Sequence, residues 1–260
     1  MKNILKVMRP DWLAGKNVML FLDFDGTLSP IAKTPERAKM SKKIRNILIR
    51  LSKSPRIKLA IISGRKINDV RKKVGIKRVI YCGLHGLEIK GPGIAWRLKY
   101  PAKYRFVKNE IKNRLVKETS RIKGIIIEDK DPILAMHYRL LGRAGQTKAL
   151  KIFERVVAEQ PKGFKAVIKC GKKVREIWPP VGWNKGKAVL WILGKITKKA
   201  KGLTIYIGDD KTDEDAFAVM KKSGWPVFVG RPGKTRARYY LNNTKQVFQY
   251  LLKLNGYLEK

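Results

Sequence analysis

A nearly continuous apolar run at positions 18–24, VMLFLDF, ends among acidic residues and most constrains how this chain can fold. Such a run is typical of a buried parallel strand. Further strands are predicted at 58–63, 79–83, 203–208 and 227–230, and helices near 44–51, 67–74 and 187–193, from Thr212, and near 245–253. Strand–helix alternation at both ends of the chain therefore predicts an α/β fold with a doubly wound, Rossmann-like parallel sheet.

The middle of the chain follows a different pattern, in which each helix is followed by two short strands. The predicted helices are 102–119 and 146–160, and the predicted strands are 124–128, 133–139, 164–170 and 173–178. We expect the adjacent strands to be antiparallel and to form a smaller α+β unit inserted into the sheet domain. The core then comprises residues 1–100 and 181–260, and the insert residues 101–180. Its expected hinges are the Gly- and Pro-bearing segments Gly91–Pro101 and Pro179–Gly182.

Acidic residues are scarce in this chain, and their places are informative. The sequence has 60 Lys and Arg residues but 20 Asp and Glu residues, a formal net charge of +40. The clustered acids are Asp23 and Asp25; Glu128, Asp129 and Asp131; and Asp209, Asp210, Asp213, Glu214 and Asp215. Carboxylates gathered against the composition of the chain indicate a metal site or acid–base chemistry within a cationic protein.

Two of these clusters fall where an α/β sheet places its ligands, at the carboxyl ends of strands. Alternation along the first strand puts Asp23 and Asp25 on the same side, and Gly26 allows a tight turn beside a ligand. Asp209 and Asp210 follow another strand. If the two strands are neighbours, their carboxylates converge and repel each other unless a divalent cation lies among them. Hard oxygen ligands favour Mg²⁺.

These segments resemble the motifs of the haloacid-dehalogenase-like phosphohydrolases, all four of which occur in order. They are Asp23-Phe24-Asp25-Gly26-Thr27, Ser63-Gly64-Arg65, Asn184-Lys185-Gly186 and Gly208-Asp209-Asp210. Further segments resemble those of the trehalose-6-phosphate phosphatase family, over nearly the whole chain from Val18 to Gly230. They are Gly83–Glu88, Glu128-Asp129-Lys130, His137-Tyr138-Arg139, Gly171–Glu176 and Gly208–Asp215.

The resemblance implies a set of catalytic roles. Asp23 is expected to attack phosphorus and form an aspartyl-phosphate, while Asp25 protonates the leaving sugar oxygen and later takes a proton from water. The resemblance assigns Mg²⁺ to Asp23, the backbone carbonyl of Asp25, and Asp209, with Asp210 or Asp213 behind them. The groups expected to hold the phosphoryl oxygens are Lys185, the Ser63 hydroxyl and the backbone N–H groups of Gly26 and Thr27.

The insert resembles the cap domain of this family, which selects the leaving group. By this resemblance, Glu128, Lys130 and Glu176 correspond to residues that bind the distal glucose hydroxyls. Carboxylates suit this task, because each can accept two sugar O–H donors. Additional substrate-binding candidates are His137 and Arg139 in the insert and Arg65 and His85 at its boundary with the core.

Several of these residues have a simpler alternative interpretation. Asp213, Glu214 and Asp215 suit the N-terminus of a helix capped by Thr212, and we prefer that interpretation for Glu214 and Asp215. The alternatives are a turn residue for His85, a solvent-facing strand residue for His137, and a surface ion pair for Glu128 and Lys130. Asp23 and Asp25 have no such alternative, because two unpaired carboxylates at the end of a buried strand would be costly without a task.

The function expected from the resemblance is hydrolysis of trehalose 6-phosphate to trehalose and phosphate. The enzymatic alternative is a related phosphatase acting on sucrose phosphate or mannosylglycerate phosphate. The non-enzymatic alternative is a binder of anionic polymers on the same fold, which the net charge supports. The charge is diffuse, and only Arg231–Tyr240 approaches a basic and aromatic nucleic-acid patch, so we do not expect nucleic acid as a partner.

The remaining sequence features concern location and partners. The longest apolar runs are too short for a membrane span, and Arg9, Pro10 and Asp11 interrupt the N-terminal apolar patch before a signal-peptide core. We therefore expect a cytoplasmic protein with no membrane partner. Trehalose 6-phosphate is the expected small-molecule substrate, and a separate trehalose-phosphate synthase is a partner compatible with the resemblance.

Overall fold

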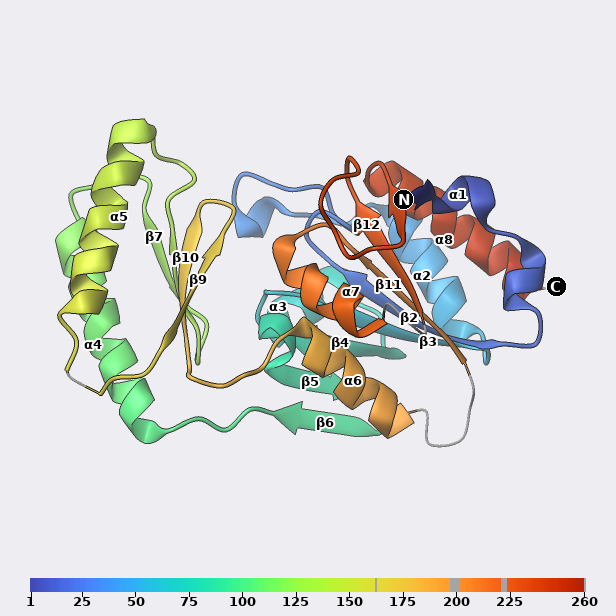
Figure 1. The fold of residues 1–260 in the computed structure, drawn as a ribbon, viewed down its shortest axis with the longest axis horizontal. Coiled ribbons are helices and arrows are strands. Elements are labelled where there is room, and N and C mark those ends of the chain that lie inside the picture. The colour runs from blue at the N-terminus through green and yellow to red at the C-terminus, as the bar shows by residue number, and fades with distance from the viewer. Residues whose placement is uncertain (162, 197–201, 221–223, 260) are drawn as a thin grey trace. The chain divides into compact units, whose positions relative to one another are not determined.

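The computed structural model describes residues 1–161, 163–196, 202–220 and 224–259 and divides the chain into two compact units (Figure 1). One unit comprises Met1–Arg97 and Trp183–Lys260, and the other comprises Leu98–Gly182. Each unit has its own sheet. Within the described residues, no helix is long and apolar enough to cross a membrane.

The first unit is built on a large sheet. In spatial order, its strands β1, β13, β12, β11, β2, β3 and β4 are parallel to one another. In spatial order the strands are β1 (Lys2–Asn3), β13 (Tyr239–Leu241), β12 (Gly224–Val229), β11 (Gly202–Gly208), β2 (Asn17–Asp23), β3 (Ile57–Ile62), β4 (Val79–Gly83), β5 (Glu88–Gly91) and β6 (Ile94–Arg97). Strand β2 lies between β11 and β3, and all its residues after Asn17 are buried. This position explains its unbroken apolar run, because both faces of a central parallel strand are covered.

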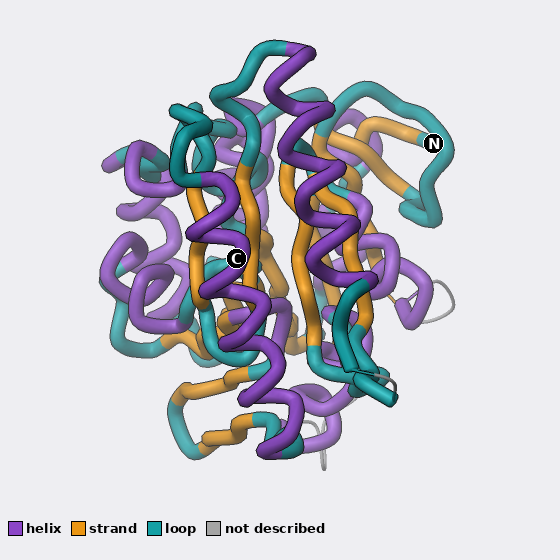
Figure 2. The backbone as a smooth tube through the Cα atoms, turned by 90° about the vertical axis from the view of Figure 1, so that its left-hand side faces the viewer, coloured by secondary structure: helices purple, strands orange, loops and turns teal. Residues whose placement is uncertain are grey.

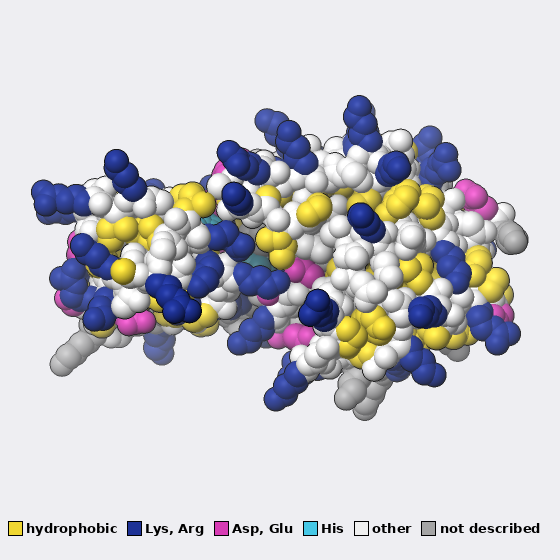
Figure 3. Space-filling model, turned by 90° about the horizontal axis from the view of Figure 1, so that it is seen from above, with side chains coloured by type: hydrophobic (Ala, Val, Ile, Leu, Met, Phe, Trp, Pro, Cys, Tyr) yellow, Lys and Arg dark blue, Asp and Glu magenta, His cyan; other side chains and the backbone are white. Residues whose placement is uncertain are grey.

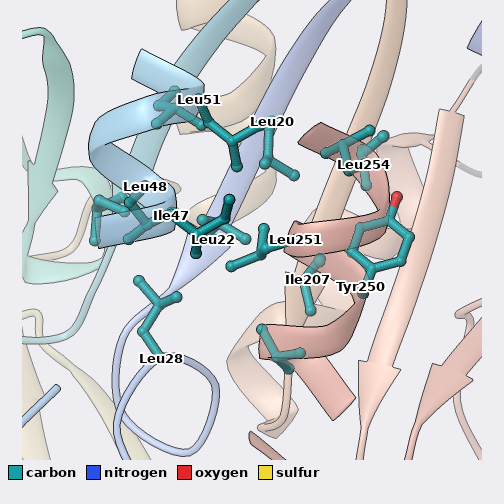
Figure 4. Packing of buried hydrophobic residues seen from close by; sticks show 14 of the residues in the cluster. Leu20, Leu22, Leu28, Ile47, Leu48, Leu51, Ile207, Tyr250, Leu251 and Leu254 are labelled. Carbon is teal, nitrogen blue, oxygen red and sulfur yellow. The ribbon is translucent and has the colours of Figure 1, made fainter. Parts of the chain in front are cut away.

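Helices cover both faces of the large sheet. The helices of this unit are α1 (Ile4–Val7), α2 (Lys42–Lys53), α3 (Ile67–Val74), α6 (Lys185–Ile196), α7 (Glu214–Met220) and α8 (Thr244–Leu258). Leu20 and Leu22 of β2 pack with α2, α3 and α8 in one core cluster, part of which Figure 4 shows. Met19 and Phe21 pack with α6 and α7 in a second cluster. Alternate residues of one strand therefore serve two cores, as the predicted doubly wound α/β fold requires; the prediction is confirmed.

The large sheet also differs from the prediction in three places. The antiparallel hairpin β5–β6 extends its edge, so the hinge predicted at Gly91–Pro101 is wrong for residues 94–97, which form β6. Strand β12 begins at Gly224, ahead of the predicted start, and pairs with β11 through Pro226. The short strands β1 and β13 were not predicted, because two or three residues carry no measurable alternation.

The second unit contains a small antiparallel sheet with two helices on one face. Its strand order is β7 (Ile126–Asp129), β8 (Leu134–His137), β10 (Val174–Trp178) and β9 (Val167–Gly171). Helices α4 (Ala102–Thr119) and α5 (Arg143–Ala158) pack side by side against the sheet, as Figure 2 shows. Their contacts form one apolar cluster that includes Ile111, Leu134 and Phe153. The predicted antiparallel pairing of both strand pairs is confirmed.

Candidate active site

The ends of β2 and β11 bring three carboxylates together at the edge of the large sheet. Strands β2 and β11 are neighbours in register, with Ile207 opposite Leu22, so Asp23 and Asp209 follow at the same edge. The carboxylate oxygens of Asp23, Asp209 and Asp213 lie within 4.8 Å of one another, and all three residues are buried. The sequence predicted that Asp23 and Asp209 converge if their strands are neighbours, and this is confirmed; the third carboxylate comes from Asp213.

Lys185, the first residue of α6, supplies a positive charge in this cluster. Its Nζ donates to Oδ1 of Asp23 at 2.7 Å and to Oδ1 of Asp213 at 2.7 Å. Burial by itself lowers the pKa of Lys185, but the Asp213 and Asp23 carboxylates outweigh that effect and raise it. The ammonium is therefore held in its charged form inside the protein.

One ammonium does not balance three carboxylates. Burial raises the pKa of Asp23 well above its ordinary value, and the carboxylates of Asp213 and Asp209 act in the same direction, while Lys185 opposes them. A bound cation would reverse this balance, because its charge favours the ionised form of every carboxylate around it. The donor set is one of hard oxygen atoms, which fits a small divalent cation.

The loop after β2 is shaped around Asp209. Gly26 has φ +91°, and a Cβ at this position would lie 2.2 Å from Oδ2 of Asp209. Only glycine allows the Asp209 carboxylate to lie this close to the loop. The Oγ1 atom of the neighbouring Thr27 is buried and has no hydrogen-bond partner among the residues that the structure describes. A buried hydroxyl of this kind is costly unless a ligand engages it, so the loop has the features of a ligand cradle.

Asp25, the second aspartate of the first motif, is paired with Arg65. Arg65 donates from Nε to Oδ2 and from Nη2 to Oδ1 of Asp25, both at 2.7 Å. Its Nη1 donates to Asp69 at 2.7 Å, and its guanidinium carbon lies 5.4 Å from the centre of the Phe24 ring. Sequence reasoning placed Arg65 among the substrate-binding candidates and missed this pairing, which joins residues forty positions apart.

Ser63 and His85 lie in one compact turn beside this pair. Ser63 is buried, and its Oγ accepts a hydrogen bond from the Arg65 backbone N–H at 3.2 Å. The backbone N–H of His85 donates to the Ser63 carbonyl at 2.8 Å, and His85 has φ +56°. The indole N–H of Trp183, which precedes α6, donates a hydrogen bond to the Gly86 carbonyl at 2.8 Å. This bond fixes the turn. His85 therefore lies in a turn, as its alternative interpretation required, and its role in substrate binding stays a prediction.

The last acidic cluster separates into different roles. The helical segment Lys211–Asp213 is capped by Asp210 and not by Thr212, so the predicted cap is wrong; Asp210 and Asp213 form a reciprocal capping box. Asp213 is completely buried and also accepts a hydrogen bond from the Tyr206 hydroxyl at 2.7 Å. Glu214 accepts hydrogen bonds from the side chain of Thr235 and the backbone of Arg236. Tyr206 was not singled out from the sequence, although it is a polar side chain in an aliphatic strand.

In the second unit, six side chains meet on the face of the small sheet opposite α4 and α5, which we call the polar face. They are Glu128, Lys130, His137, Lys169, Glu176 and Trp178. Lys130 Nζ lies 3.2 Å from Oε1 of Glu176 and 3.7 Å from Oε2 of Glu128. His137 Nε2 lies 2.9 Å from the same Glu128 oxygen.

Three further residues of the second unit that the sequence analysis considered lie away from the polar face. Arg139 is exposed and donates to the backbone carbonyl of Lys172 at 2.8 Å. Asp129 and Asp131, which the sequence groups with Glu128, instead pair with Lys108 of α4. The cause is strand alternation, which turns Glu128 and Asp129 to opposite faces of the sheet.

A doubly wound sheet with a buried acidic centre at its carboxyl edge is the architecture expected of a phosphohydrolase with the motifs found in this sequence. The family model described as trehalose-phosphatase matches residues 21–244. The chain belongs to the trehalose-phosphatase family, and the resemblance noted from its motifs is confirmed.

Known proteins agree with this assignment. The chain is 36% identical over 254 residues to a probable trehalose-phosphate phosphatase E of Arabidopsis thaliana, covering 92% of this chain and 70% of the relative. It is 35% identical to a probable trehalose-phosphate phosphatase 4 of Oryza sativa subsp. japonica, covering 92% and 66%. The chain thus spans about two thirds of the length of these relatives.

Solved structures show the same fold. The C-terminal domain of the C. albicans trehalose-6-phosphate phosphatase has a TM-score of 0.80 at 26% identity, covering 93% of this chain and 92% of that one. A haloacid dehalogenase-like hydrolase from Bacteroides thetaiotaomicron has a TM-score of 0.64 at 18% identity, covering 92% of this chain and 100% of that one. The second similarity supports the fold alone.

Proposed function

We propose that this protein hydrolyses trehalose 6-phosphate to trehalose and phosphate. The observation that carries the proposal is the buried cluster of Asp23, Asp209, Asp213 and Lys185 at the carboxyl edge of the large sheet, in a chain of the trehalose-phosphatase family. Phosphate monoesters are very slow to hydrolyse unaided, and a site of this kind supplies both a nucleophile and fixed charge.

The nucleophile is Asp23. Lys185 engages Oδ1 of Asp23, so Oδ2 is the oxygen that attacks phosphorus. In the first step a bond forms between Asp23 and phosphorus, the bond from phosphorus to the sugar oxygen breaks, and Asp25 gives that oxygen a proton. In the second step Asp25 takes a proton from water, the water oxygen bonds to phosphorus, and Asp23 is released as a carboxylate.

Arg65 governs the availability of Asp25. Both carboxylate oxygens of Asp25 accept hydrogen bonds from Arg65. An oxygen of Asp25 must therefore leave the guanidinium before it carries a proton to the sugar. The Ser63 hydroxyl, the ammonium of Lys185, the Thr27 hydroxyl and the backbone N–H groups of Gly26 and Thr27 hold the phosphoryl oxygens.

Mg²⁺ fits the donor set of Asp23, Asp209 and the backbone carbonyl of Asp25. When bound, it supplies positive charge opposite the phosphoryl oxygens. Asp213 lies within reach of the same centre, but its oxygens already accept hydrogen bonds from Lys185, Tyr206 and the backbone of Asp210. Asp213 therefore supports the centre mainly by holding Lys185, and Asp210 by capping the following turn.

The second unit acts as a cap that selects the leaving group. Glu128, Lys130 and Glu176 share the polar face, where two carboxylates and an ammonium offer acceptors and donors for sugar hydroxyls. His137 supports Glu128 through the contact between its Nε2 and Oε2 of Glu128. Arg139 stays a candidate for substrate binding on the family resemblance. Sucrose phosphate and mannosylglycerate phosphate are disfavoured because the Glu128–Lys130 and His137–Arg139 segments resemble those of the trehalose-6-phosphate phosphatase family.

An anionic polymer is a weaker candidate ligand. On the face seen in Figure 3, Lys and Arg side chains are spread across the surface and do not gather into one patch. Polymer binding favours a continuous basic track.

We expect trehalose 6-phosphate to be supplied by a separate synthase in the cytoplasm, as the family resemblance suggests.

The test is release of inorganic phosphate from trehalose 6-phosphate in the presence of Mg²⁺, beside sucrose 6-phosphate and glucose 6-phosphate. We expect trehalose 6-phosphate to exceed the others in kcat/KM by about 100-fold or more. Asp23→Asn should abolish turnover with an unchanged circular dichroism spectrum, while the matched Asp11→Asn variant, at an exposed position, stays active. Equal rates on all sugar phosphates would refute the specific substrate.

A further inference from the structure

The carboxylate of Glu176 is held at both of its oxygens. Lys130 Nζ donates to Oε1 at 3.2 Å, and the indole Nε1 of Trp178 donates to Oε2 at 3.0 Å. Glu176 is 8% exposed, so its carboxylate depends on such partners. The two donors reach different oxygens, and together they hold the carboxylate in one orientation.

Trp178 is itself held by Lys169 from the neighbouring strand. The Nζ atom of Lys169 lies 3.4 Å from the centre of the Trp178 ring, and Trp178 is 1% exposed. In this register Lys169 lies directly opposite Glu176. Trp178 lies two residues beyond Glu176 on the same strand, so Lys169 is its diagonal neighbour. A cation over a buried indole face is attracted by the ring, and this attraction fixes the plane of the indole.

The same register aligns the polar side chains in one row across the small sheet. Glu128 and Glu176 both pair with Ala135, and Lys169 pairs with Glu176. Glu128, Ala135, Glu176 and Lys169 therefore follow one another on adjacent strands. The small side chain of Ala135 leaves room between the two carboxylates.

We infer that Trp178 and Lys169 are positioning residues for sugar recognition, which orient the Glu176 carboxylate toward pyranose hydroxyls of the substrate. Lys169 fixes the indole, and the indole N–H fixes Glu176. The ligand class is a neutral sugar with several adjacent hydroxyl donors. This inference rests on the proposed function, because it assigns the sugar-binding step of the same reaction.

A double-mutant cycle tests the inference. Trp178→Phe removes the N–H and keeps an aromatic ring, so kcat/KM for trehalose 6-phosphate should fall about tenfold, the effect typical of a lost hydrogen bond to a charged group. The loss should appear in KM. In a Glu176→Ala background, Trp178→Phe should cause no further loss, because Trp178 acts through Glu176. Additive losses would mean that Trp178 has only a structural role and would overturn the inference.

A sugar-free substrate separates recognition from chemistry. Hydrolysis of p-nitrophenyl phosphate should stay within about twofold of wild type in Trp178→Phe, since no sugar hydroxyl is bound. Lys169→Met keeps an unbranched side chain and should raise KM for trehalose 6-phosphate about threefold. Matched controls are Trp191→Phe on α6 and Lys165→Met, at an exposed position; both should behave as wild type.

The outcomes separate the inference from the proposed function. Wild-type protein that releases no phosphate from trehalose 6-phosphate overturns the proposed function, and the same cycle on the fastest sugar phosphate of the panel then decides the inference. Active wild type with an unchanged KM in Trp178→Phe and Lys169→Met overturns the inference alone. If Trp178→Phe fails to fold by circular dichroism, the cycle of Lys169→Met with Glu176→Ala replaces it.

Discussion

The ammonium of Lys185 lies 2.7 Å from Oδ1 of Asp23, and the two side chains are 3% and 6% exposed. Asp23 ends a strand near the start of the chain, and Lys185 begins a helix beyond the insert. Their pairing links the two halves of the first unit directly at the acidic centre. Asp213 completes the pairing from a third segment. The centre therefore forms only when residues on both sides of the insert fold together.

The first prediction concerns the charge balance of this centre. Lys185→Ala leaves the Asp23 and Asp213 carboxylates without their shared ammonium partner, and the phosphoryl group loses a cationic contact. We expect kcat for phosphate release to fall by about 10²–10³-fold, as for the loss of one charge-stabilising donor. Lys187→Ala, two positions along the same helix at an exposed site, is the matched control. A Lys185→Ala variant with wild-type kcat would contradict the role given to this residue.

The second prediction concerns the clamp on Asp25. Arg65→Lys keeps the positive charge but cannot donate two parallel hydrogen bonds to Asp25 while also reaching Asp69. The Asp25 carboxylate then loses its fixed orientation, and we expect kcat to fall about tenfold with little change in KM. Steady-state kinetics measure both quantities. The matched control is Arg71→Lys, at an exposed position in α3, which should leave both quantities unchanged.

Much of this fold follows from local sequence patterns. The strands β2, β3, β4 and β11 were predicted to within one residue at each end, because long apolar runs bounded by turn residues mark strands clearly. Asp23 and Asp209 were placed correctly because both follow such strands. The edge hairpin β5–β6 was missed, since Gly91 and Gly93 at its turn suggested a hinge.

Pairings between distant segments could not be derived from the sequence. Arg65 with Asp25, Trp178 with Lys169 and Tyr206 with Asp213 each join side chains whose proximity depends on strand register or loop packing. No local period encodes such a contact. The acidic segment around Glu128 could not be divided from the sequence for the same reason. Strand alternation turns Glu128 and Asp129 to opposite faces of the small sheet, and the partner of Asp129 is Lys108 of α4.

The third prediction concerns the metal. Mg²⁺ held by Asp23 and Asp209 would relieve the repulsion among the buried carboxylates, Asp213 included, so it should bind the folded state and raise Tm. Asp209→Asn removes one negative ligand and should weaken this Mg²⁺-dependent rise, with the Mg²⁺ concentration for half-maximal activity increasing about tenfold or more. Differential scanning calorimetry with EDTA, and then with added Mg²⁺, measures the shift. An identical shift in wild type and Asp209→Asn would place the ion elsewhere.

The fourth prediction concerns stability at low pH and the buried Lys108. Lys108 is 2% exposed on α4, and its Nζ donates to Asp129 at 2.8 Å and to Asp131 at 3.3 Å. Burial alone raises the pKa of both aspartates, but hydrogen bonds from Lys108 and, respectively, Lys112 or Tyr100 outweigh it, so both pKa values lie below the ordinary 3.8. A depressed carboxyl pKa stabilises the folded state above the unfolded pKa, and this stabilisation is lost as pH falls through the folded pKa.

The stabilisation from Lys108 is therefore present at neutral pH and disappears in acid. Lys108→Met keeps most of the side-chain volume and removes the ammonium, so it should reduce the free energy of unfolding by about 1–3 kcal/mol at pH 7. The difference from wild type should shrink as pH falls below 3.8, because protonated Asp129 and Asp131 no longer attract the buried charge. Urea unfolding between pH 7 and pH 3 measures both values, with the exposed Lys103→Met on the same helix as the control. A difference that is constant across this range would show that Lys108 stabilises the protein by packing alone.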